Sequence, residues 1–302
     1  MYLRHWKLAQ RPFDERVDPR WFFSSTVHQE VLLKLQHAVE QRAGIAILAG
    51  GLGCGKSMVA TLLAEGLSRE THPVFRFALT PATAIDGLEG IVEQLRHSTP
   101  SASASTEGTS EQRAEAAVEE LERLLAERAE AGQHPVVILD AADWLKDAEL
   151  HGLVRLLRSL NVQRQPALTT VLIGSVELLV RARRVAETDD QLFPQCLLGA
   201  MPAADTAGYI THRIRMAGGE PSLFSEPAHS LIHDLSGGIP RRINRLCDLS
   251  LLVGFAEEAD QIDPKHVWTA QSEIRVLAPT RTATAPAPHH WRPLSRRQLQ
   301  HR

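Results

Sequence analysis

The chain has 302 residues, of which 43% are hydrophobic and 23% are charged, and its formal net charge is −3. This composition is ordinary for a globular protein and provides no overall attraction to nucleic acid or anionic membrane. The length allows a sizeable core and predicts two domains plus tails. No segment approaches the roughly 20 apolar residues of a membrane span. The cysteines are too widely spaced for a disulfide framework or a zinc site. We therefore expect a cytoplasmic protein.

The first forty residues show two different patterns. Residues 1–24 are irregular but rich in aromatic side chains, which indicates a segment packed on a domain rather than a free tail. Thr26 and Gln29 resemble a capping box, and the apolar residues that follow recur at helical spacing as far as Val39. We expect residues 1–40 to form an N-terminal segment and a helix that pack on the core.

The next segment contains a complete phosphate-binding loop. An apolar run over residues 45–49 predicts a buried strand, and residues 58–65 predict a helix. Between them the pattern G-x-x-x-x-G-K-S is filled by Gly50, Gly51, Leu52, Gly53, Cys54, Gly55, Lys56 and Ser57.

Each part of this loop has a chemical role. Glycines let the backbone fold tightly so that N–H groups point at phosphate oxygens, and the helix N-terminus adds further donors. In such a loop Lys56 reaches the β- and γ-phosphates, and the hydroxyl of Ser57 binds Mg²⁺. The sequence therefore predicts a site for a nucleoside triphosphate and Mg²⁺.

Strand and helix patterns alternate up to about residue 202. Apolar runs predict strands over residues 74–79, 136–139 and 169–173. Helical patterns cover residues 87–96, 109–131 and 148–161. Residues 98–110 are a low-complexity stretch for which we expect a disordered loop. The alternation favours an α/β fold with a parallel sheet covered on both faces, with residues 41–202 as the core.

Only helical patterns follow residue 202. Helices are expected over residues 204–217, 226–235 and 240–255. A further helix begins with Asp263 as N-cap and Pro264 in the first position. We expect residues 203–275 to form a small all-helical domain. Residues 276–302 contain prolines and arginines without an acidic residue, which indicates a disordered basic tail.

The end of the third expected strand provides the second half of the nucleotide site. Asp140 follows an apolar run, where its carboxylate would hold Mg²⁺ directly or through water. In hydrolysing ATPases of this kind a Glu usually follows that Asp and orients the attacking water, but this chain has Ala141. A methyl group cannot polarise water, and loss of a general base costs about 10²- to 10⁴-fold in rate. Asp143 is the candidate substitute, and an alternative is that nothing replaces the Glu.

Several segments resemble the general secretion pathway protein A (ExeA-type) family of AAA+ ATPases, to which bacterial transposition ATPases are related. They are residues 2–13 and 18–22, the phosphate loop, residues 173–178 and residues 236–248. The resemblance covers residues 1–275. It implies a P-loop NTPase of the AAA+ type, with an αβα core, a helical lid, and ATP bound between them and neighbouring subunits of a ring.

The resemblance also implies roles for individual residues. Arg241 matches the sensor 2 arginine, which reaches from the lid to the γ-phosphate. An arginine at a helix start faces the positive end of the helix dipole, so a bound anion would explain its position. Ser175 falls at the polar sensor 1 position, where the family often has Gln. The Gln-Arg-Ile motif that precedes the lid and provides an arginine finger is replaced by residues 192–197, which contain no Arg. Such a finger is worth about 10³- to 10⁵-fold in rate.

These observations lead to three hypotheses. The first is an AAA+ protein that binds ATP and Mg²⁺, hydrolyses ATP slowly or not at all, and uses lid closure to control a partner protein or assembly. It would act in a homo- or hetero-oligomer with other AAA+ subunits, for example as a non-hydrolysing subunit in a mixed ring. The second is a working ATPase of the secretion type, in which Asp143 or a partner residue replaces the missing groups. The third is a DNA-associated adaptor of the transposition type, supported by Arg181, Arg183, Arg184 and the basic tail.

Overall fold

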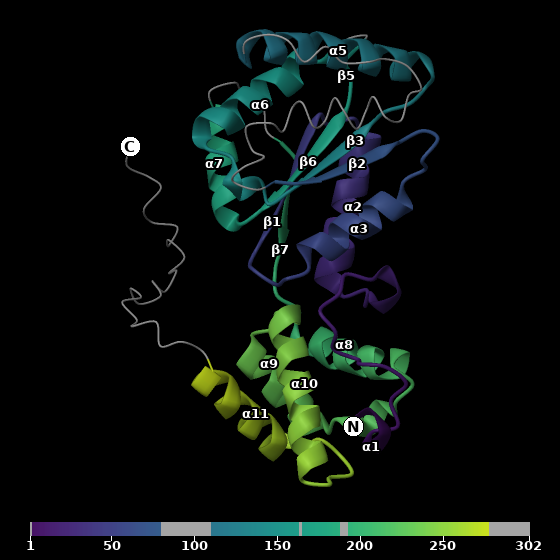
Figure 1. Ribbon diagram of the computed structural model, residues 1–302, viewed down its shortest axis with the longest axis vertical. Coiled ribbons are helices and arrows are strands. Elements are labelled where there is room, and N and C mark those ends of the chain that lie inside the picture. Colours follow the sequence, from purple (N-terminus) through teal and green to yellow (C-terminus); the bar gives the residue numbers. More distant parts are fainter. Residues whose placement is uncertain (1, 80–109, 163–164, 188–192, 278–302) are drawn as a thin grey trace, which may run out of the picture.

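The computed structural model describes residues 2–79, 110–162, 165–187 and 193–277. Within these ranges an α/β domain, at the top of Figure 1, is joined to a helical domain below it. The helix expected over residues 87–96, nearly all of the loop expected over residues 98–110, and the tail from residue 278 onward lie outside the described residues.

The α/β domain is built on a five-stranded parallel sheet in the order β2-β3-β6-β1-β7. The strands are β1 (Ile45–Gly50), β2 (Val74–Ala78), β3 (Val136–Asp140), β6 (Thr169–Gly174) and β7 (Gln195–Leu198). Every residue of β1 and β6 is buried, which explains their continuous apolar runs. This arrangement confirms the α/β prediction.

Some strands were not predicted from the sequence. The edge strand β7 is only 4 residues long, and it forms because Cys196 pairs with Leu48 of β1. A short antiparallel pair, β4 (Asn161–Val162) and β5 (Gln165–Pro166), was also missed. Runs this short carry too little periodicity to be recognised in a sequence.

Helices cover both faces of the sheet, as Figure 1 shows. One face carries α2 (Thr26–Glu40) and α3 (Lys56–Gly66), whose apolar side chains pack with Ala46 and Leu48 of β1. The other face carries α5 (Ser110–Glu130), α6 (Asp147–Ser159) and α7 (Val176–Glu187), which pack with Ile45 and Ile47. Successive residues of β1 therefore fill two separate cores. The short 3₁₀ helix η2 (Ala142–Trp144) follows β3.

The N-cap of α2 corrects one expectation. Ser25, not Thr26, is the cap, and its side chain accepts a hydrogen bond from the backbone N–H of His28. Thr26 instead uses both its backbone N–H and its hydroxyl as donors to Asp205 in the helical domain. The N-cap therefore lies one residue before the expected position, and the expected cap, Thr26, binds a carboxylate that is distant in the sequence.

The helical domain contains the helices expected after residue 202. They are α8 (Ala203–Met216), α9 (Glu226–Ser236), α10 (Pro240–Ala256) and α11 (Pro264–Leu277), with a 3₁₀ turn, η3 (Pro221–Leu223), between the first two. Their apolar faces surround a separate core that includes Ile210, Ile232 and Leu251. Figure 1 shows the four helices gathered below the sheet.

The N-terminal segment belongs to the helical domain, which corrects the expectation that all of residues 1–40 packs on the α/β core. In α1 (Tyr2–His5) the hydroxyl of Tyr2 donates to Asp248 Oδ1 at 2.8 Å. Trp6 Nε1 donates to the carbonyl of Leu251 at 2.9 Å, and Phe13 is also buried in this core. A small helical domain buries too little apolar surface alone, so these aromatic side chains enlarge its core. Only α2 packs on the sheet.

Candidate nucleotide-binding site

The phosphate loop joins β1 to α3 and requires its glycines. Gly53 and Gly55 have φ values of +81° and +103°, in the left-handed region that L side chains avoid. A Cβ atom on Gly53 would lie 2.6 Å from Cβ of Arg241, and one on Gly55 would lie 2.5 Å from Nε2 of His28. The loop is therefore in close contact with both the lid and α2.

The two predicted Mg²⁺ ligands meet directly. Ser57 Oγ donates to Asp140 Oδ2 at 3.1 Å, although β6 lies between β3, which ends at Asp140, and β1, which precedes the loop and α3. The other carboxylate oxygen accepts the backbone N–H of Ala141 at 2.8 Å. A hydroxyl and a carboxylate are oxygen donors that suit Mg²⁺, which commonly takes few protein ligands beside nucleotide phosphates. Within the described ranges no group of His, Cys, Asp or Glu side chains forms a separate metal site.

Lys56 lies beside the start of the loop. Its Nζ donates to the carbonyls of Gly50 and Gly51 at 2.9 and 3.0 Å. Both contacts are with the backbone that would surround a phosphate, so the ammonium group is already held at the loop. The contact of Lys56 with β- and γ-phosphates stays a prediction.

The structure brings Asp143 and Ser175 together, but it pairs them with each other. The backbone N–H of Ser175 lies 3.0 and 2.9 Å from the carboxylate oxygens of Asp143, and Ser175 Oγ donates to the same carboxylate at 2.7 Å. This contact joins η2 to the turn between β6 and α7. In this arrangement Asp143 orients the turn that contains Ser175, and both its oxygens accept hydrogen bonds from that one residue.

Ala141 occupies the position at which a Glu would orient water. Its φ is 58°, a left-handed conformation that is uncommon for a residue with a side chain. The main chain turns sharply here from β3 into η2. The residue lines the cavity but offers only a methyl group to it.

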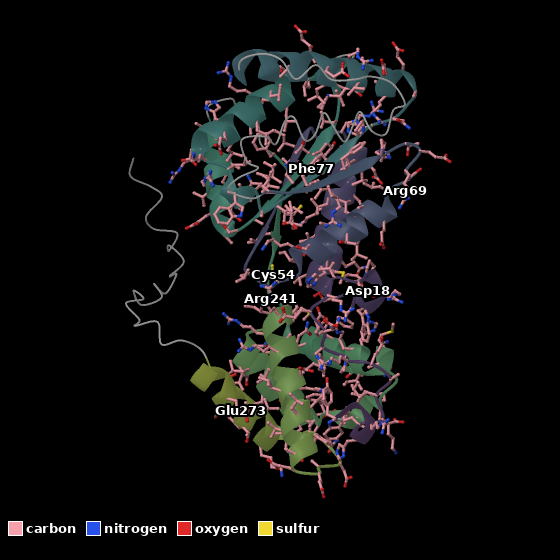
Figure 2. All side chains as sticks on the ribbon, in the orientation of Figure 1. Asp18, Cys54, Arg69, Phe77, Arg241 and Glu273 are labelled. Atoms are coloured by element: carbon pink, nitrogen blue, oxygen red, sulfur yellow. The ribbon has the colours of Figure 1, made fainter. Side chains whose placement is uncertain are left out.

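Arg241 brings the lid to the phosphate loop. It is the second residue of α10, and its backbone N–H donates to the carbonyl of Gly53 at 3.2 Å. Its Nε lies 3.8 Å from Oε2 of Glu15, and the two side chains are 53% and 59% exposed. Cys54 and Arg241 lie where the two domains meet (Figure 2). The guanidinium is thus placed at the cavity with a carboxylate from the N-terminal segment as its neighbour.

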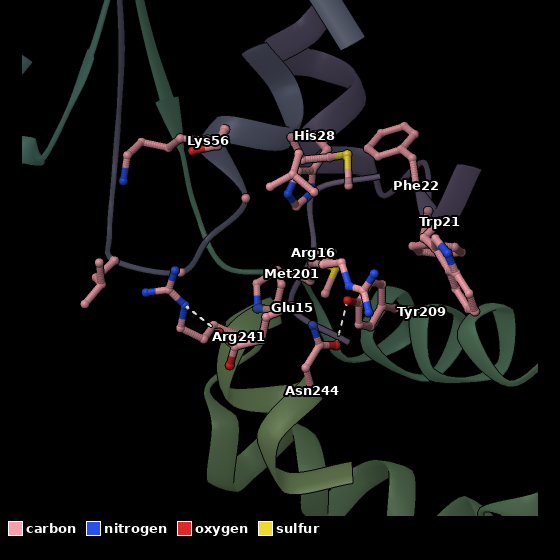
Figure 3. A pocket seen from close by; sticks show the side chains of 18 of the residues that line it. Glu15, Arg16, Trp21, Phe22, His28, Lys56, Met201, Tyr209, Arg241 and Asn244 are labelled. Atoms are coloured by element: carbon pink, nitrogen blue, oxygen red, sulfur yellow. Dashed lines mark hydrogen bonds and ion pairs between the residues drawn. The ribbon is translucent and has the colours of Figure 1, made fainter. Parts of the chain in front are cut away.

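A cavity of about 350 Å³ lies between the two domains. Figure 3 shows Lys56 and Arg241 on one side of it and Trp21, Phe22 and Tyr209 on the other. The hydroxyl of Tyr209 donates to Asn244 Oδ1 at 2.7 Å. A charged end and an aromatic end suit a ligand that joins a polyphosphate to a flat base.

Arg213 supports the aromatic end. It is 4% exposed and donates to the carbonyls of Pro12 and Asp14 at 2.6 Å each. Its guanidinium carbon lies 5.0 Å from the ring centre of Trp21 and 5.7 Å from that of Tyr209. Arg213 therefore holds the N-terminal segment against α8, where the segment forms a wall of the cavity.

The sequence reasoning missed the cavity residues that come from the N-terminal segment and from α2 and α8. They are Asp14, Glu15, Arg16, Val17, Trp21, Phe22, Phe23, His28, Tyr209 and Arg213. The aromatic clustering near the N-terminus was a usable signal for some of them, but it indicated packing rather than a binding wall. Spacing along the chain does not show that distant segments share a cavity.

The arginines proposed for DNA binding are largely engaged within the chain. Arg181 Nε donates to Asp147 Oδ1 at 2.6 Å, and the same side chain reaches the carbonyl of Leu145. Arg183 Nε donates to Gln195 Oε1 at 2.9 Å. In the stretch compared with the Gln-Arg-Ile motif (residues 192–197), residues 195–197 belong to β7. Among the described helices, none combines the length and the apolar character of a membrane span.

Comparisons with known proteins agree with this geometry. A family model described as "AAA domain" matches residues 39–181. General secretion pathway protein A of Aeromonas hydrophila is 29% identical over 282 residues, covering 91% of this chain and 48% of that protein. The chain thus spans about half the length of this curated relative.

Solved structures share the fold at low sequence identity. The ORC2 protein of Aeropyrum pernix, in ADPNP-ADP complexes, has a TM-score of 0.59 at 18% identity and covers 87% of this chain and 71% of its own. Cdc6p of Pyrobaculum aerophilum has a TM-score of 0.60 at 15% identity, with 85% and 71% covered. The five-stranded parallel sheet and its phosphate loop have the fold of a P-loop NTPase of the AAA+ type. Residues 39–181 are similar to an AAA domain, and the chain is similar to general secretion pathway protein A.

Proposed function

We propose that this chain is an ATP-dependent switch with slow or absent hydrolysis. ATP and Mg²⁺ bind between the α/β domain and the helical lid, and the bound nucleotide closes one on the other to control a partner protein or assembly. Since ATP and Mg²⁺ are supplied in the cytoplasm, we also propose that location. The site roles of Lys56, Ser57, Asp140 and Arg241 are part of this proposal.

The observation that carries the proposal is the state of the hydrolytic groups. Ala141 presents a methyl group where an activating carboxylate is needed. Asp143, the candidate substitute, is bound through both oxygens to Ser175. Asp143 lines the same cavity, but a general base must accept a proton from the attacking water, and both oxygens of this carboxylate already accept hydrogen bonds from Ser175.

The groups that would bind ATP are present and converge on one cavity. Lys56, Ser57 and Asp140 line it from the α/β domain, and Arg241 lines it from the lid. The similar ORC2 protein is described in ADPNP-ADP complexes, which supports a nucleotide at this place in the fold. General decay of the site would not separate binding groups from hydrolytic groups. The division favours a protein that uses binding and not turnover.

The proposed partner is another AAA+ subunit, in a homo- or hetero-oligomer. No Arg lies between Arg184 and Arg213, so the chain has no arginine finger at the family's place before the lid. A mixed ring in which an active paralogue hydrolyses ATP would tolerate this loss. The working-ATPase alternative needs Asp143 or a partner residue to replace the missing groups. The DNA-adaptor alternative loses support because Arg181 and Arg183 contact other residues of the chain.

Steady-state ATP hydrolysis tests the proposal, with Lys56→Ala as the blank and nucleotide binding measured in parallel by calorimetry. We expect ATP to bind to the wild-type chain while turnover is indistinguishable from the blank. Turnover clearly above the blank would establish the working-ATPase alternative, and Asp143→Ala would then identify whether that carboxylate is responsible. Absence of ATP binding by a folded wild-type chain would overturn the nucleotide site itself.

A further inference from the structure

We infer that His28 is a positioning residue of the phosphate loop, which holds the peptide between Cys54 and Gly55 so that the N–H of Gly55 faces the phosphate. The inference rests on the proposed nucleotide site and adds a residue from outside the loop motif. His28 lies in the first turn of α2, is 5% exposed, and lines the cavity beside the loop, as Figure 3 shows.

Both ring nitrogens of His28 are engaged, and the contacts determine the tautomer. Nε2 lies 2.9 Å from the carbonyl oxygen of Cys54, and Nδ1 lies 2.6 Å from Ser25 Oγ. Because a carbonyl can only accept, Nε2 carries the proton and donates to Cys54. In the neutral ring Nδ1 then accepts a hydrogen bond from the hydroxyl of Ser25. The cap of α2 thus orients the ring that contacts the loop.

The geometry of a trans peptide transmits this contact to the phosphate side. The carbonyl of Cys54 and the N–H of Gly55 belong to one planar unit and point in opposite directions. With the carbonyl directed at His28, the N–H of Gly55 points away from α2, and Gly55 lines the cavity. A backbone N–H pointing into such a loop is a phosphate donor. His28 therefore orients a binding group that it does not itself form.

The same ring also fills the space beside Gly55. A Cβ on Gly55 would lie 2.5 Å from Nε2 of His28, and the left-handed φ of +103° requires glycine in any case. Without the ring, this peptide would lose both its hydrogen bond and its lateral contact. Glycine-rich backbone reorients easily, so an external anchor matters more here than in a helix.

The surroundings keep the ring neutral. Burial lowers the pKa of His28, while the Cys54 carbonyl and the carboxylate of Asp205 on α8 act in the opposite direction. The other groups that face it are the Ser25 hydroxyl and the ring of Phe22, whose centre lies 6.2 Å from that of the imidazole. A neutral ring keeps the Nδ1 lone pair that Ser25 needs, so the anchor stays in one orientation.

Substitution of His28 in the full chain tests the inference, with ATP and ADP affinities measured by calorimetry and thermal unfolding measured without nucleotide. Gln places an amide nitrogen the same number of bonds from Cα as Nε2, so we expect His28→Gln to bind ATP within about threefold of wild type. His28→Leu keeps bulk but removes the donor, and we expect about a tenfold loss for both nucleotides, the value of one hydrogen bond. His37→Leu, at an exposed position on the same helix, is the matched control and should bind like wild type.

The outcomes separate positioning from simple packing. Weakened binding in His28→Leu with rescue by His28→Gln supports the inference. Equal losses in both variants, or wild-type affinity in His28→Leu, overturn it. If His28→Leu does not fold, Ser25→Ala provides the second test: loss of the ring's Nδ1 partner should weaken ATP binding about threefold in a folded protein, and unchanged affinity would count against the anchor. Failure of the wild-type chain to bind ATP would instead refute the proposed function.

Discussion

Replacement of Arg213 by Met should separate the N-terminal segment from the lid. The side chain is 4% exposed and makes the contacts with the carbonyls of Pro12 and Asp14 described above. Met keeps an unbranched apolar stem of similar length but cannot donate, so both carbonyls lose their charged partner. The structural question is whether these contacts hold the cavity wall in place.

The expected magnitude follows from the hydrogen bonds. A bond to a charged group contributes about 1.5–3 kcal/mol, and the buried guanidinium costs desolvation that Met avoids. Contacts with the rings of Trp21 and Tyr209 add about 1 kcal/mol. We therefore expect Arg213→Met to lower the free energy of unfolding by about 3 kcal/mol. The free energy of unfolding of Arg213→Lys should lie between those of wild type and Arg213→Met, because an ammonium group lacks the planar fork that reaches both carbonyls.

Urea unfolding followed by tryptophan fluorescence and circular dichroism would measure the loss, and calorimetry would measure ATP affinity. Arg215→Met is the matched control, because Arg215 lies on the same helix but is exposed, and it should stay within about 0.5 kcal/mol of wild type. We expect ATP affinity to fall only in the Arg213 variants, since Trp21 lines the cavity. If Arg213→Met unfolds like the control, the reasoning that assigns Arg213 this role is wrong.

Three further predictions concern the site and the core. Ala141→Glu should raise ATP turnover above the Lys56→Ala blank by up to about 10²-fold, less than a full general base gives because no arginine finger accompanies it; a turnover assay showing no gain would mean that the missing carboxylate is not the limiting group. Glu15→Gln should raise the affinity for ATP about twofold to fivefold and leave the affinity for ADP almost unchanged, because Arg241 would no longer have to leave the Glu15 carboxylate to contact the γ-phosphate. Equal changes in the two affinities, measured by calorimetry, would refute this. Burial, with smaller contributions from Arg42 and His72, lowers the pKa of His134 to about 4. The unfolded chain, with a His pKa of about 6.5, therefore binds more protons, and stability should decrease as pH falls from about 6.5 toward 4. His134→Gln should flatten that dependence in urea unfolding at several pH values, and an unchanged slope would contradict the assignment.

Asp143 and Ser175, which the sequence analysis singled out separately as site residues, bind each other in the structure. Asp143 was the candidate replacement for a missing Glu, and Ser175 was the sensor 1 candidate. Their hydrogen bonds join η2, which contains Asp143, to the turn after β6, which contains Ser175. A serine side chain is short, and its contact with Asp143 keeps it at the turn. Asp143 therefore has the chemical type and the approximate position of a general base, but its oxygens are engaged by Ser175.

Local patterns were enough to determine the phosphate loop, four strands of the sheet and the helices of the lid. The loop depends on glycines at set spacing, and the fully buried strands depend on continuous apolar runs, so both are written in adjacent residues. The family resemblance added Arg241 and Ser175. The tertiary structure alone decided which domain each distant segment would complete. The N-terminal aromatic side chains, β7, Arg213 and the His28 anchor depend on contacts between residues far apart in the chain. A sequence pattern records periodicity along one element, whereas these contacts form only when separate elements pack against each other.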